Sequence, residues 1–190
     1  MRECMAFPTR VTGLPTPFGP VHLFWTDRGS KPVVTRILLH GDVRSAARRQ
    51  AMQATGGRGE IPGEISQLLA EIRAFLAGRD IAFGTGLLDL DNCPPFQRRV
   101  LLAERAIPRG YISTYGRIAR HLGMPGGARA VGNALANNPF PIAIPCHRAL
   151  RWDGHPGGFQ GGRTMKVRLL AMEGIRFRPD GRAVMDRVFY

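Results

Sequence analysis

The apolar positions in the first half of the chain follow a strand pattern and then a helix pattern. Val21–Trp25 and Val33–Leu39 are short runs rich in β-branched, aromatic and aliphatic residues, and a turn separates them, so they predict two strands. Apolar residues then recur every three or four positions from Ile65 to Leu76, followed by Gly78, which predicts an amphipathic helix and its end. Together these elements predict a small α/β unit, in which we find no pattern typical of catalysis.

The second half has the patterns of several short helices. We expect helices over Phe96–Ala106, over Tyr115–Leu122 with Thr114 as N-cap, and over Gly127–Ala136. The last two are joined by a short turn that contains glycine, which is typical of a helix-turn-helix. A further helix is expected from about Thr164 to Met172.

The helix predicted over Gly127–Ala136 has two different faces. When residues are placed at about 100° intervals, one face carries a single long cation among small side chains: Arg129, Gly132, Asn133 and Ala136. The opposite face is apolar and indicates a core contact. A flat face with one projecting arginine suits close approach to a nucleic acid, and a solvated arginine on an alanine-rich helix is the alternative.

Charge is distributed unevenly along the chain. The net charge is +13, and residues 1–95 carry 11 Lys and Arg against 9 Asp and Glu, whereas residues 96–190 carry 16 against 5. Such an asymmetry is typical of a protein with a polyanionic partner. Arginine supplies 25 of the 27 basic residues, and its guanidinium group suits phosphate forks and stacking on bases. A basic face in contact only with solvent is the alternative.

The composition predicts a protein of a reducing compartment. No stretch approaches about 18 consecutive apolar residues, and the N-terminus lacks the apolar core of a signal peptide, so we expect no membrane association. Cys4, Cys93 and Cys146 are too few for a disulfide framework. A zinc site built from Cys4, His22, His40 and Cys93 remains an alternative without the usual ligand spacing.

The candidate chemistry lies in one short segment. Cys146, His147 and Arg148 directly follow the apolar run Ile142–Pro145, which indicates a buried strand or a tight core segment. A cysteine is a strong nucleophile only as a thiolate, and a nearby imidazole or cation promotes that state. The alternative is a core cysteine beside a surface His-Arg pair.

Glu173 is unusual for its position. It lies at the end of the last predicted helix, where a carboxylate opposes the helix dipole, and its neighbours one turn earlier are Leu169 and Leu170. A glutamate on an apolar side needs a partner, and His147 is the candidate. Placement on a solvated edge is the alternative.

These motifs together resemble the O6-alkylguanine-DNA alkyltransferases, also called methylated-DNA–protein-cysteine methyltransferases. The most specific motif is Pro145-Cys146-His147-Arg148, and the resemblance spans about residues 15–177. Its other matching segments are Phe96-Gln97, Ile107-Pro108, Ser113-Thr114-Tyr115-Gly116, Ala128-Arg129-Ala130-Val131-Gly132, Asn138-Pro139, Gly157-Gly158-Phe159, Gly161-Gly162, Lys166, Leu169-Leu170, Glu173 and, more weakly, Thr16-Pro17-Phe18-Gly19-Pro20.

The resemblance implies a division into domains. Residues 1–92 would form an α/β domain with a small sheet plus a helix, like ribonuclease H, and residues 93–95 a linker. Residues 96–178 would form a mostly helical domain with a winged helix-turn-helix, which binds DNA and carries the alkyl transfer. Residues 179–190 would form a tail whose Pro179–Gly181 turn is compatible with a hairpin.

The resemblance also implies a mechanism without metal or cofactor. Cys146 would accept the alkyl group, His147 would act as base through a water molecule, Glu173 would orient the imidazole, and Asn138 would order the adjacent hinge. A water is plausible because neighbouring side chains usually diverge. The product is a thioether, which has no acyl carbon for water to attack, so each molecule would act once.

The implied partner is double-stranded DNA that carries alkylated guanine, with alkylated thymine as a further substrate. Tyr115 would help rotate the nucleotide, and Arg129 would fill the vacated stack on a minor-groove helix with Gly132, Asn133 and Ala136. We expect a monomer, with clustering on DNA left open, in the cytoplasm and associated with the nucleoid.

The implied guanine pocket consists of Tyr115, Ala149, Phe159, Gln160, Gly161 and Lys166. Position 159 departs from the family, which has tyrosine there, so a pocket hydroxyl is lost. The backbone amides of Gln160 and Gly161 remain as donors to the leaving oxygen.

Two other functions compete with alkyl transfer. One is a lesion-binding module that does not transfer the group, as in alkyltransferase-like relatives. The other is a Cys-His thiol hydrolase, a chemistry that needs neither a helix-turn-helix nor a basic half.

Overall fold

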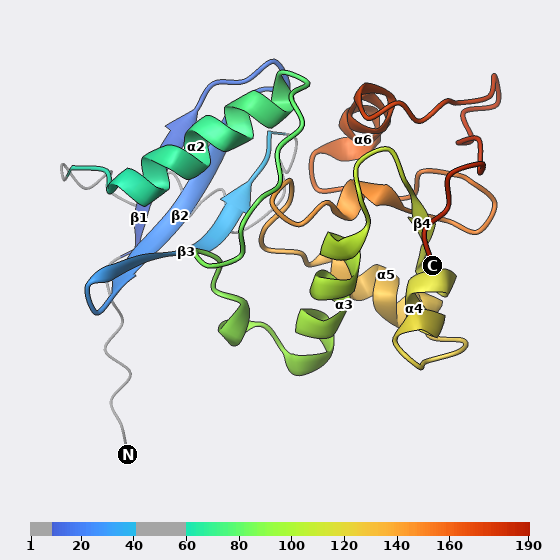
Figure 1. Cartoon of the computed structure of the whole chain (residues 1–190), viewed down its shortest axis with the longest axis horizontal. Helices are drawn as coiled ribbons and strands as arrows, with labels where there is room; N and C mark the ends of the chain where they lie inside the picture. Colours follow the sequence, from blue (N-terminus) through green and yellow to red (C-terminus); the bar gives the residue numbers. More distant parts are fainter. Residues whose placement is uncertain (1–8, 41–59) are drawn as a thin grey trace.

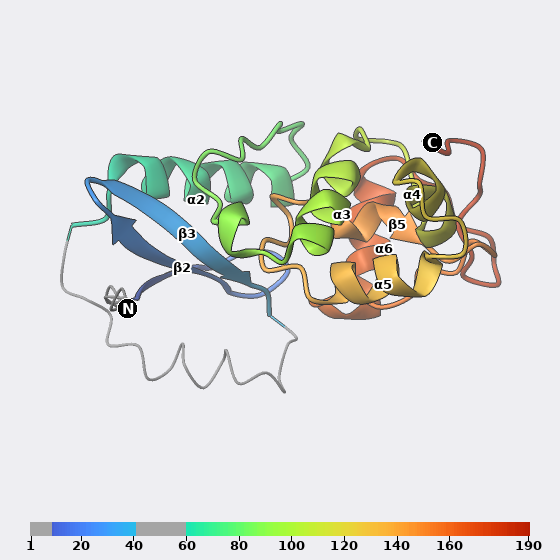
Figure 2. The ribbon, with the colours of Figure 1, turned by 90° about the horizontal axis from the view of Figure 1, so that it is seen from below.

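The computed structural model describes residues 9–40 and 60–190, and these form two regions side by side (Figures 1 and 2). The first region is an antiparallel sheet in the order β1 (Arg10–Leu14), β2 (Val21–Arg28), β3 (Lys31–Leu38). Helix α2 (Gly63–Leu76) lies along this sheet (Figure 1). The predicted strands and helix are therefore present, and the α/β class is correct.

Alternation along β2 explains the core of the first region. Val21, Leu23 and Trp25 point to one face and are almost fully buried, as are Ile65 and Ile72 of α2. Side chains at successive strand positions point to opposite faces, so this alternation directs one face of β2 toward the helix. Strand β1 was not predicted from the sequence; its Arg-Val-Thr-Gly-Leu pattern has little apolar content, and its pairing with β2 stabilises it.

The second region begins after a short turn, η1 (Leu90–Asn92), and consists mainly of helices. Its elements are α3 (Pro95–Ala106), β4 (Ser113–Thr114), α4 (Tyr115–His121), α5 (Ala128–Ala136), η2 (Cys146–Arg148), β5 (Ala149–Leu150) and α6 (Gly162–Met172). Strands β4 and β5 form a short parallel pair.

Helices α4 and α5 are joined by a short turn and pack on each other and on α3. The predicted N-cap is present, because the Thr114 hydroxyl accepts a hydrogen bond from the Arg117 amide at 3.2 Å. Figure 2 shows α3, α4 and α5 grouped at the end of the molecule away from the sheet.

The last residues fold back over the second region. Phe177 and Ala183 form an antiparallel bridge across a turn in which Gly181 has a φ of 78°. Val188 then pairs with Ile112, and the Tyr190 hydroxyl donates to the Ala103 carbonyl at 2.9 Å. The end of the chain therefore packs against α3 and β4.

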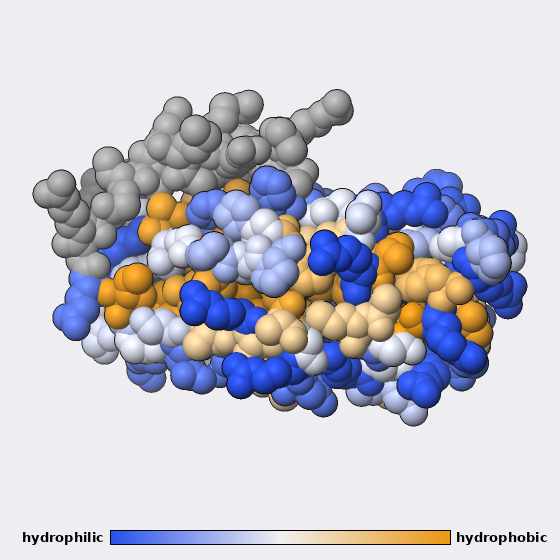
Figure 3. All heavy atoms as spheres, turned by 90° about the horizontal axis from the view of Figure 1, so that it is seen from above, coloured by the Kyte–Doolittle hydropathy of each residue, from blue (hydrophilic) through white to orange (hydrophobic). Residues whose placement is uncertain are grey.

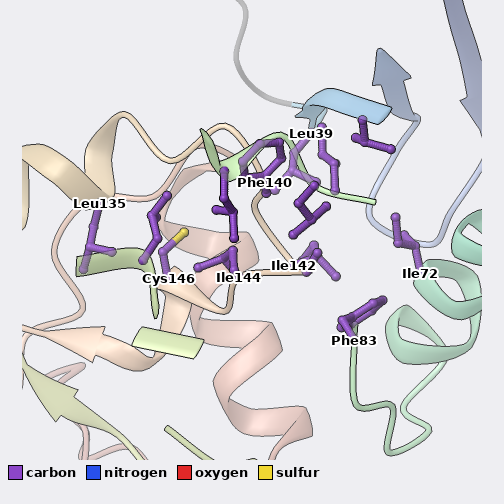
Figure 4. Close-up of a cluster of buried hydrophobic side chains, with 14 of the residues drawn as sticks. Leu39, Ile72, Phe83, Leu135, Phe140, Ile142, Ile144 and Cys146 are labelled. Carbon is purple, nitrogen blue, oxygen red and sulfur yellow. The ribbon is translucent and has the colours of Figure 1, made fainter. Parts of the chain in front are cut away.

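The two regions share a continuous apolar contact. Figure 4 shows side chains from Ile72 and Phe83 on one side to Phe140, Ile142 and Cys146 on the other as one band. All of these belong to a single buried cluster. The Ile37 amide also donates to the Pro139 carbonyl at 2.7 Å, so the end of β3 is attached to the loop before the cysteine.

Four large apolar side chains are exposed in residues 9–40 and 60–190: Ile61, Leu102, Tyr111 and Trp152. Figure 3 shows, on one face, a band of hydrophobic residues between hydrophilic ones. Trp152 is the most exposed of these four, at 82%. It lies in a turn in which the Gly154 amide donates to the Arg151 carbonyl at 3.0 Å. Within the described ranges, no helix has both the length and the apolar character required to cross a bilayer.

Candidate active site

The segment before Cys146 is a tight turn in the core, one of the two structures that the sequence left open. Pro141 and Ile144 form a bridge, and the Ile144 amide donates to the Phe140 carbonyl at 2.8 Å. Ile142 has a φ of 76°, which is strained for a β-branched residue, and its side chain is 1% exposed. The surrounding core therefore holds a strained backbone four residues before the thiol.

Asn138 fixes this turn from inside. Its side-chain nitrogen donates to the Ile144 carbonyl at 3.1 Å, and its oxygen accepts from the Phe140 amide at 2.9 Å. The residue is 4% exposed, so few competing partners are available. The Asn138 side chain therefore connects both ends of the turn that leads to Cys146.

Cys146 is buried and stays protonated at rest. Burial raises the pKa of its thiol to about 11, although the Asn138 side chain and the Lys166 ammonium oppose this shift. The thiolate is the reactive species. A proton acceptor close to the sulfur is therefore needed before Cys146 can act as a nucleophile.

His147 contacts Glu173, the partner that the sequence suggested. Its Nε2 lies 3.0 Å from Oε1 of Glu173, and both side chains are fully buried. Burial lowers the pKa of His147, so the imidazole is neutral near pH 7. Because the carboxylate accepts at Nε2, the proton resides there and Nδ1 keeps a free electron pair. Within the described part of the chain, Nδ1 has no hydrogen-bond partner.

Arg148 completes this group, a role that the sequence analysis missed. Its Nε and Nη2 donate to the two oxygens of Glu173 at 2.8 and 2.7 Å, and Nη1 donates to the Ile107 carbonyl at 2.6 Å. Burial alone would raise the pKa of Glu173, but its bonds and charge contacts with His147 and Arg148 lower it to about 2. Since His147 is neutral, Arg148 supplies the permanent charge. The sequence did contain a signal for this role, because the carboxylate of Glu173 on an apolar helix face needs a charged partner.

Aromatic rings enclose the imidazole on two sides. The ring centroid of His147 lies 6.0 Å from that of Phe75 and 6.2 Å from that of Phe159. Phe75 belongs to α2, in the region where the sequence showed no chemistry. Helix periodicity predicts that Phe75 is buried, but it does not show which residue it contacts.

Two of the expected pocket residues, Ala149 and Tyr115, lie beside Lys166. Its buried Nζ donates to the carbonyls of Ala149 at 2.7 Å and Gly158 at 3.2 Å, and it lies 6.0 Å from the centre of the Tyr115 ring. A Cβ on Gly157 would lie 2.9 Å from the Tyr115 hydroxyl, so glycine permits this approach. Burial lowers the pKa of Lys166 to about 8 and raises that of Tyr115 to about 12.

Gln160 and Gly161 lie at the end of the pocket loop, the segment 151–161 between β5 and α6. The Gln160 side-chain oxygen accepts from the Leu39 amide at 3.0 Å, which ties this loop to the end of β3. A Cβ on Gly161 would lie 2.2 Å from the sulfur of Met165, so the helix start packs tightly there. The first region thus holds the loop through a side chain for which the sequence suggested only a backbone role.

Of the residues expected at DNA, Tyr115 lies beside Lys166, whereas the other four lie on the outer face of α5. Arg129, Asn133 and Ala136 are exposed, and a Cβ on Gly132 would meet open space. The inner face buries Val131, Ala134 and Leu135. The two faces of α5 therefore divide as the helical projection predicted, with Ala134 as an additional core residue.

No group of three or more His, Cys, Asp or Glu side chains in residues 9–40 and 60–190 is arranged to hold a metal ion. His22, His40 and Cys93 therefore do not gather. Cys4, the fourth member of the zinc alternative, lies outside the described residues.

Comparison with known proteins points to one family. A sequence profile described as "6-O-methylguanine DNA methyltransferase, DNA binding domain" matches residues 95–175. The methylated-DNA–protein-cysteine methyltransferase of Methanothermobacter thermautotrophicus is 47% identical over 114 residues, which cover 60% of this chain and 64% of that protein. The protein of the same name from Mycolicibacterium paratuberculosis is 37% identical over 145 residues, covering 76% of this chain and 82% of the relative.

Solved structures agree with this finding. The O6-methylguanine methyltransferase of Mycobacterium tuberculosis has a TM-score of 0.68 and 32% identity, and the match covers 87% of this chain and 92% of that chain. A structure described as Mycobacterium tuberculosis OGT in complex with DNA has a TM-score of 0.69 and 31% identity, with 87% and 93% covered.

Proposed function

Because the chain belongs to the methylated-DNA–protein-cysteine methyltransferase family, we propose that it repairs DNA by direct reversal, moving an alkyl group from O6 of guanine to Sγ of Cys146. The observation that carries this proposal is the buried group of three residues. Glu173 fixes Nε2 of His147, so Nδ1 remains as a proton acceptor on the residue that directly follows a thiol in need of deprotonation.

The transfer follows from this arrangement. A water passes the thiol proton to Nδ1 of His147, and the resulting thiolate attacks the alkyl carbon. The S–C bond forms as the C–O6 bond breaks, and the electron pair stays on guanine, which takes up a proton. Tyr115 donates to the base, and the amides of Gln160 and Gly161 hold the leaving oxygen. The thioether product is stable, so each molecule acts once.

DNA binding falls to the second region. We assign residues 96–178 to a winged helix-turn-helix domain that enters the minor groove, joined through residues 93–95 to a ribonuclease-H-like domain over 1–92 and followed by a tail over 179–190. Arg129 fills the space of the flipped nucleotide on the flat face of α5. Flipping costs a few kcal/mol, which this contact helps to offset. Counterion release by the basic second region supplies most of the affinity.

The cellular setting follows from the substrate. The partner is double-stranded DNA with alkylated guanine, and alkylated thymine is a second substrate. The protein acts as a monomer in the cytoplasm, in contact with the nucleoid.

Intact mass after reaction with a methylated oligonucleotide tests the function. The parent protein gains one methyl group per molecule, and Cys146→Ser gains none because a serine hydroxyl ionises poorly. Cys93→Ser is the matched control, since Cys93 is also buried and lies outside the site. Binding without a mass gain in the parent would support a lesion-binding module, and repeated turnover would support a hydrolase. Either result contradicts the proposal.

A further inference from the structure

Helix α3 buries a carboxyl group for which the repair reaction described above has no use. Glu104 is 0% exposed and lies on the same helix face as Val100 and Leu101, which are also fully buried. Neither of its oxygens makes a hydrogen bond of normal geometry with the residues that the structure describes, although the backbone amide of Ala149 is near enough to lower its pKa. Burying a carboxyl group without good hydrogen-bond partners lowers the stability of the fold, most of all when the group is ionised.

The charged and titratable groups that face Glu104 belong to the proposed active site. Helix α3 packs directly on η2, which carries Cys146. The facing groups come from four other elements: Lys166 of α6, Cys146 and Arg148 of η2, Tyr115 of α4, and Tyr190 at the end of the chain.

Two of these groups are cations, and only Lys166 is available to Glu104. Arg148 is already committed to both oxygens of Glu173 and to a backbone carbonyl. The Lys166 ammonium group donates two of its three protons to backbone carbonyls. Carbonyls are neutral, so these two hydrogen bonds leave its positive charge uncompensated. Lys166 favours the thiolate of Cys146, and an ionised Glu104 disfavours it.

We propose that Glu104 is a positioning residue for alkyl transfer: when neutral it leaves the positive charge of Lys166 beside Cys146 uncompensated, and when ionised it cancels that charge and limits the reaction. The proton that Glu104 loses goes to solvent. The inference rests on the proposed function, because it concerns the nucleophile of that reaction.

The titration of the two groups supports this role. Burial raises the pKa of Glu104 to about 8 and lowers that of Lys166 to about 8, with opposing contributions from the other charges. Below that pH the pair is one neutral acid and one cation. Above it the pair passes through zero charge to a net negative charge. The charge near Cys146 therefore changes from positive toward negative as the pH rises through about 8.

The pH dependence of single-turnover transfer tests the proposal. From about pH 6 to about pH 10, the parent rate is expected to stop rising near the pKa of the Glu104–Lys166 pair. Glu104→Gln keeps the shape and the neutral form, so its rate continues to rise and exceeds the parent rate by about fivefold or more at alkaline pH. Glu104→Asp restores the limit. If Glu104→Gln keeps the alkaline behaviour of the parent, the proposal fails.

A double substitution separates a positioning role from a structural one. In a Lys166→Met background, Glu104→Gln is expected to change the alkaline rate by less than it does in the parent, because only the direct repulsion between Glu104 and the thiolate then remains. Glu104→Leu is expected to raise the melting temperature by a few degrees, since it removes a buried polar group without good hydrogen-bond partners. A lower melting temperature together with an equal loss of rate at every pH would show a purely structural role and overturn the proposal.

A measurement on the thiol itself keeps this inference distinct from the repair function. In a Cys4→Ser, Cys93→Ser background, the rate of iodoacetamide addition to Cys146 reports its ionisation without any DNA. Glu104→Gln is expected to increase this rate at alkaline pH even if no alkylated base is ever accepted. An unchanged titration of Cys146 contradicts the inference, and a missing methyl transfer in the parent contradicts only the proposed function.

Discussion

The two regions of the molecule bury different kinds of side chain. In the described sheet and α2 the buried residues are apolar, with cores formed by residues such as Leu23 and Ile72. The second region buries a set of polar and charged groups: Glu104, Ser113, Thr114, Asn138, His147, Arg148, Lys166 and Glu173. Buried charges are a weak source of stability and a strong source of reactivity. We infer that the first region stabilises and holds a second region whose interior serves chemistry.

The largest effect is expected from breaking the charged group of the second region. Glu173→Gln leaves the guanidinium of Arg148 buried without a charge partner and loosens Nε2 of His147. We expect a loss of about 3–5 kcal/mol in the free energy of unfolding and a transfer rate lower by about a hundredfold or more. Urea denaturation and single-turnover kinetics measure these two changes. Glu64→Gln, at an exposed position of α2, is the control.

Acid titration sharpens the same test. The pKa of Glu173 in the folded protein is about 2, against an ordinary value of 4.5, so the unfolded chain takes up a proton first as the pH falls. The stability due to Glu173 is therefore present above pH 4.5 and is lost as the pH falls toward 2. The depressed pKa of His147 adds a loss of the same sign at higher pH. In Glu173→Gln the free energy of unfolding should not show this decrease below pH 4.5. If it decreases with pH as steeply as in the parent, the Glu173 carboxylate is not the cause of the decrease.

A core substitution in the first region should affect stability alone. Leu23→Ala removes a fully buried side chain from β2 and is expected to lower the free energy of unfolding by about 2–5 kcal/mol. The transfer rate per folded molecule should stay the same below the unfolding temperature. Phe75→Leu, which alters the ring beside His147, should instead lower the rate despite a smaller loss of stability. If both substitutions change the transfer rate equally, then Phe75 does not act through its contact with His147 and only stabilises the fold, as Leu23 does.

The outer face of α5 gives a smaller and more selective effect. Arg129→Ala is expected to slow repair of a duplex by about tenfold or more, because only a duplex requires base flipping. Reaction with a free alkylated guanine base should be almost unchanged. Transfer to each substrate is measured in parallel, with Arg163→Ala as an exposed arginine control outside α5. Equal losses on the two substrates would assign Arg129 a structural role.

The smallest effect is expected at the pocket wall. Phe159→Tyr adds one hydroxyl to the ring that faces His147, and we expect faster transfer of small alkyl groups by no more than about tenfold, close to one net hydrogen bond of roughly 1 kcal/mol. Single-turnover kinetics on a methylated oligonucleotide decide this. A loss greater than a hundredfold would show that the pocket is built around phenylalanine.

The periodicity of apolar residues predicted most helices and strands, because the spacing of apolar residues along one element shows which of its faces is buried. The same spacing does not show which other element that face contacts. Arg148 reaches Glu173 across 25 positions, and Phe75 reaches the imidazole from another region. Glu104 is an exception that left a signal, because it occupies the apolar face of α3 four residues after Val100. A glutamate on such a face needs a partner, just as Glu173 does.

The contrast between the regions extends to their optical properties. The chain has two tryptophans; Trp25 is 2% exposed in the sheet, and Trp152 is 82% exposed in the turn after β5. A dissolved quencher such as iodide reaches Trp152 but not Trp25. The emission that remains in its presence therefore comes from Trp25, and the emission that is lost comes from Trp152. Each region therefore contains its own natural fluorophore. Unfolding of the sheet and events at the surface near the pocket loop can be followed separately in one sample, without an attached dye.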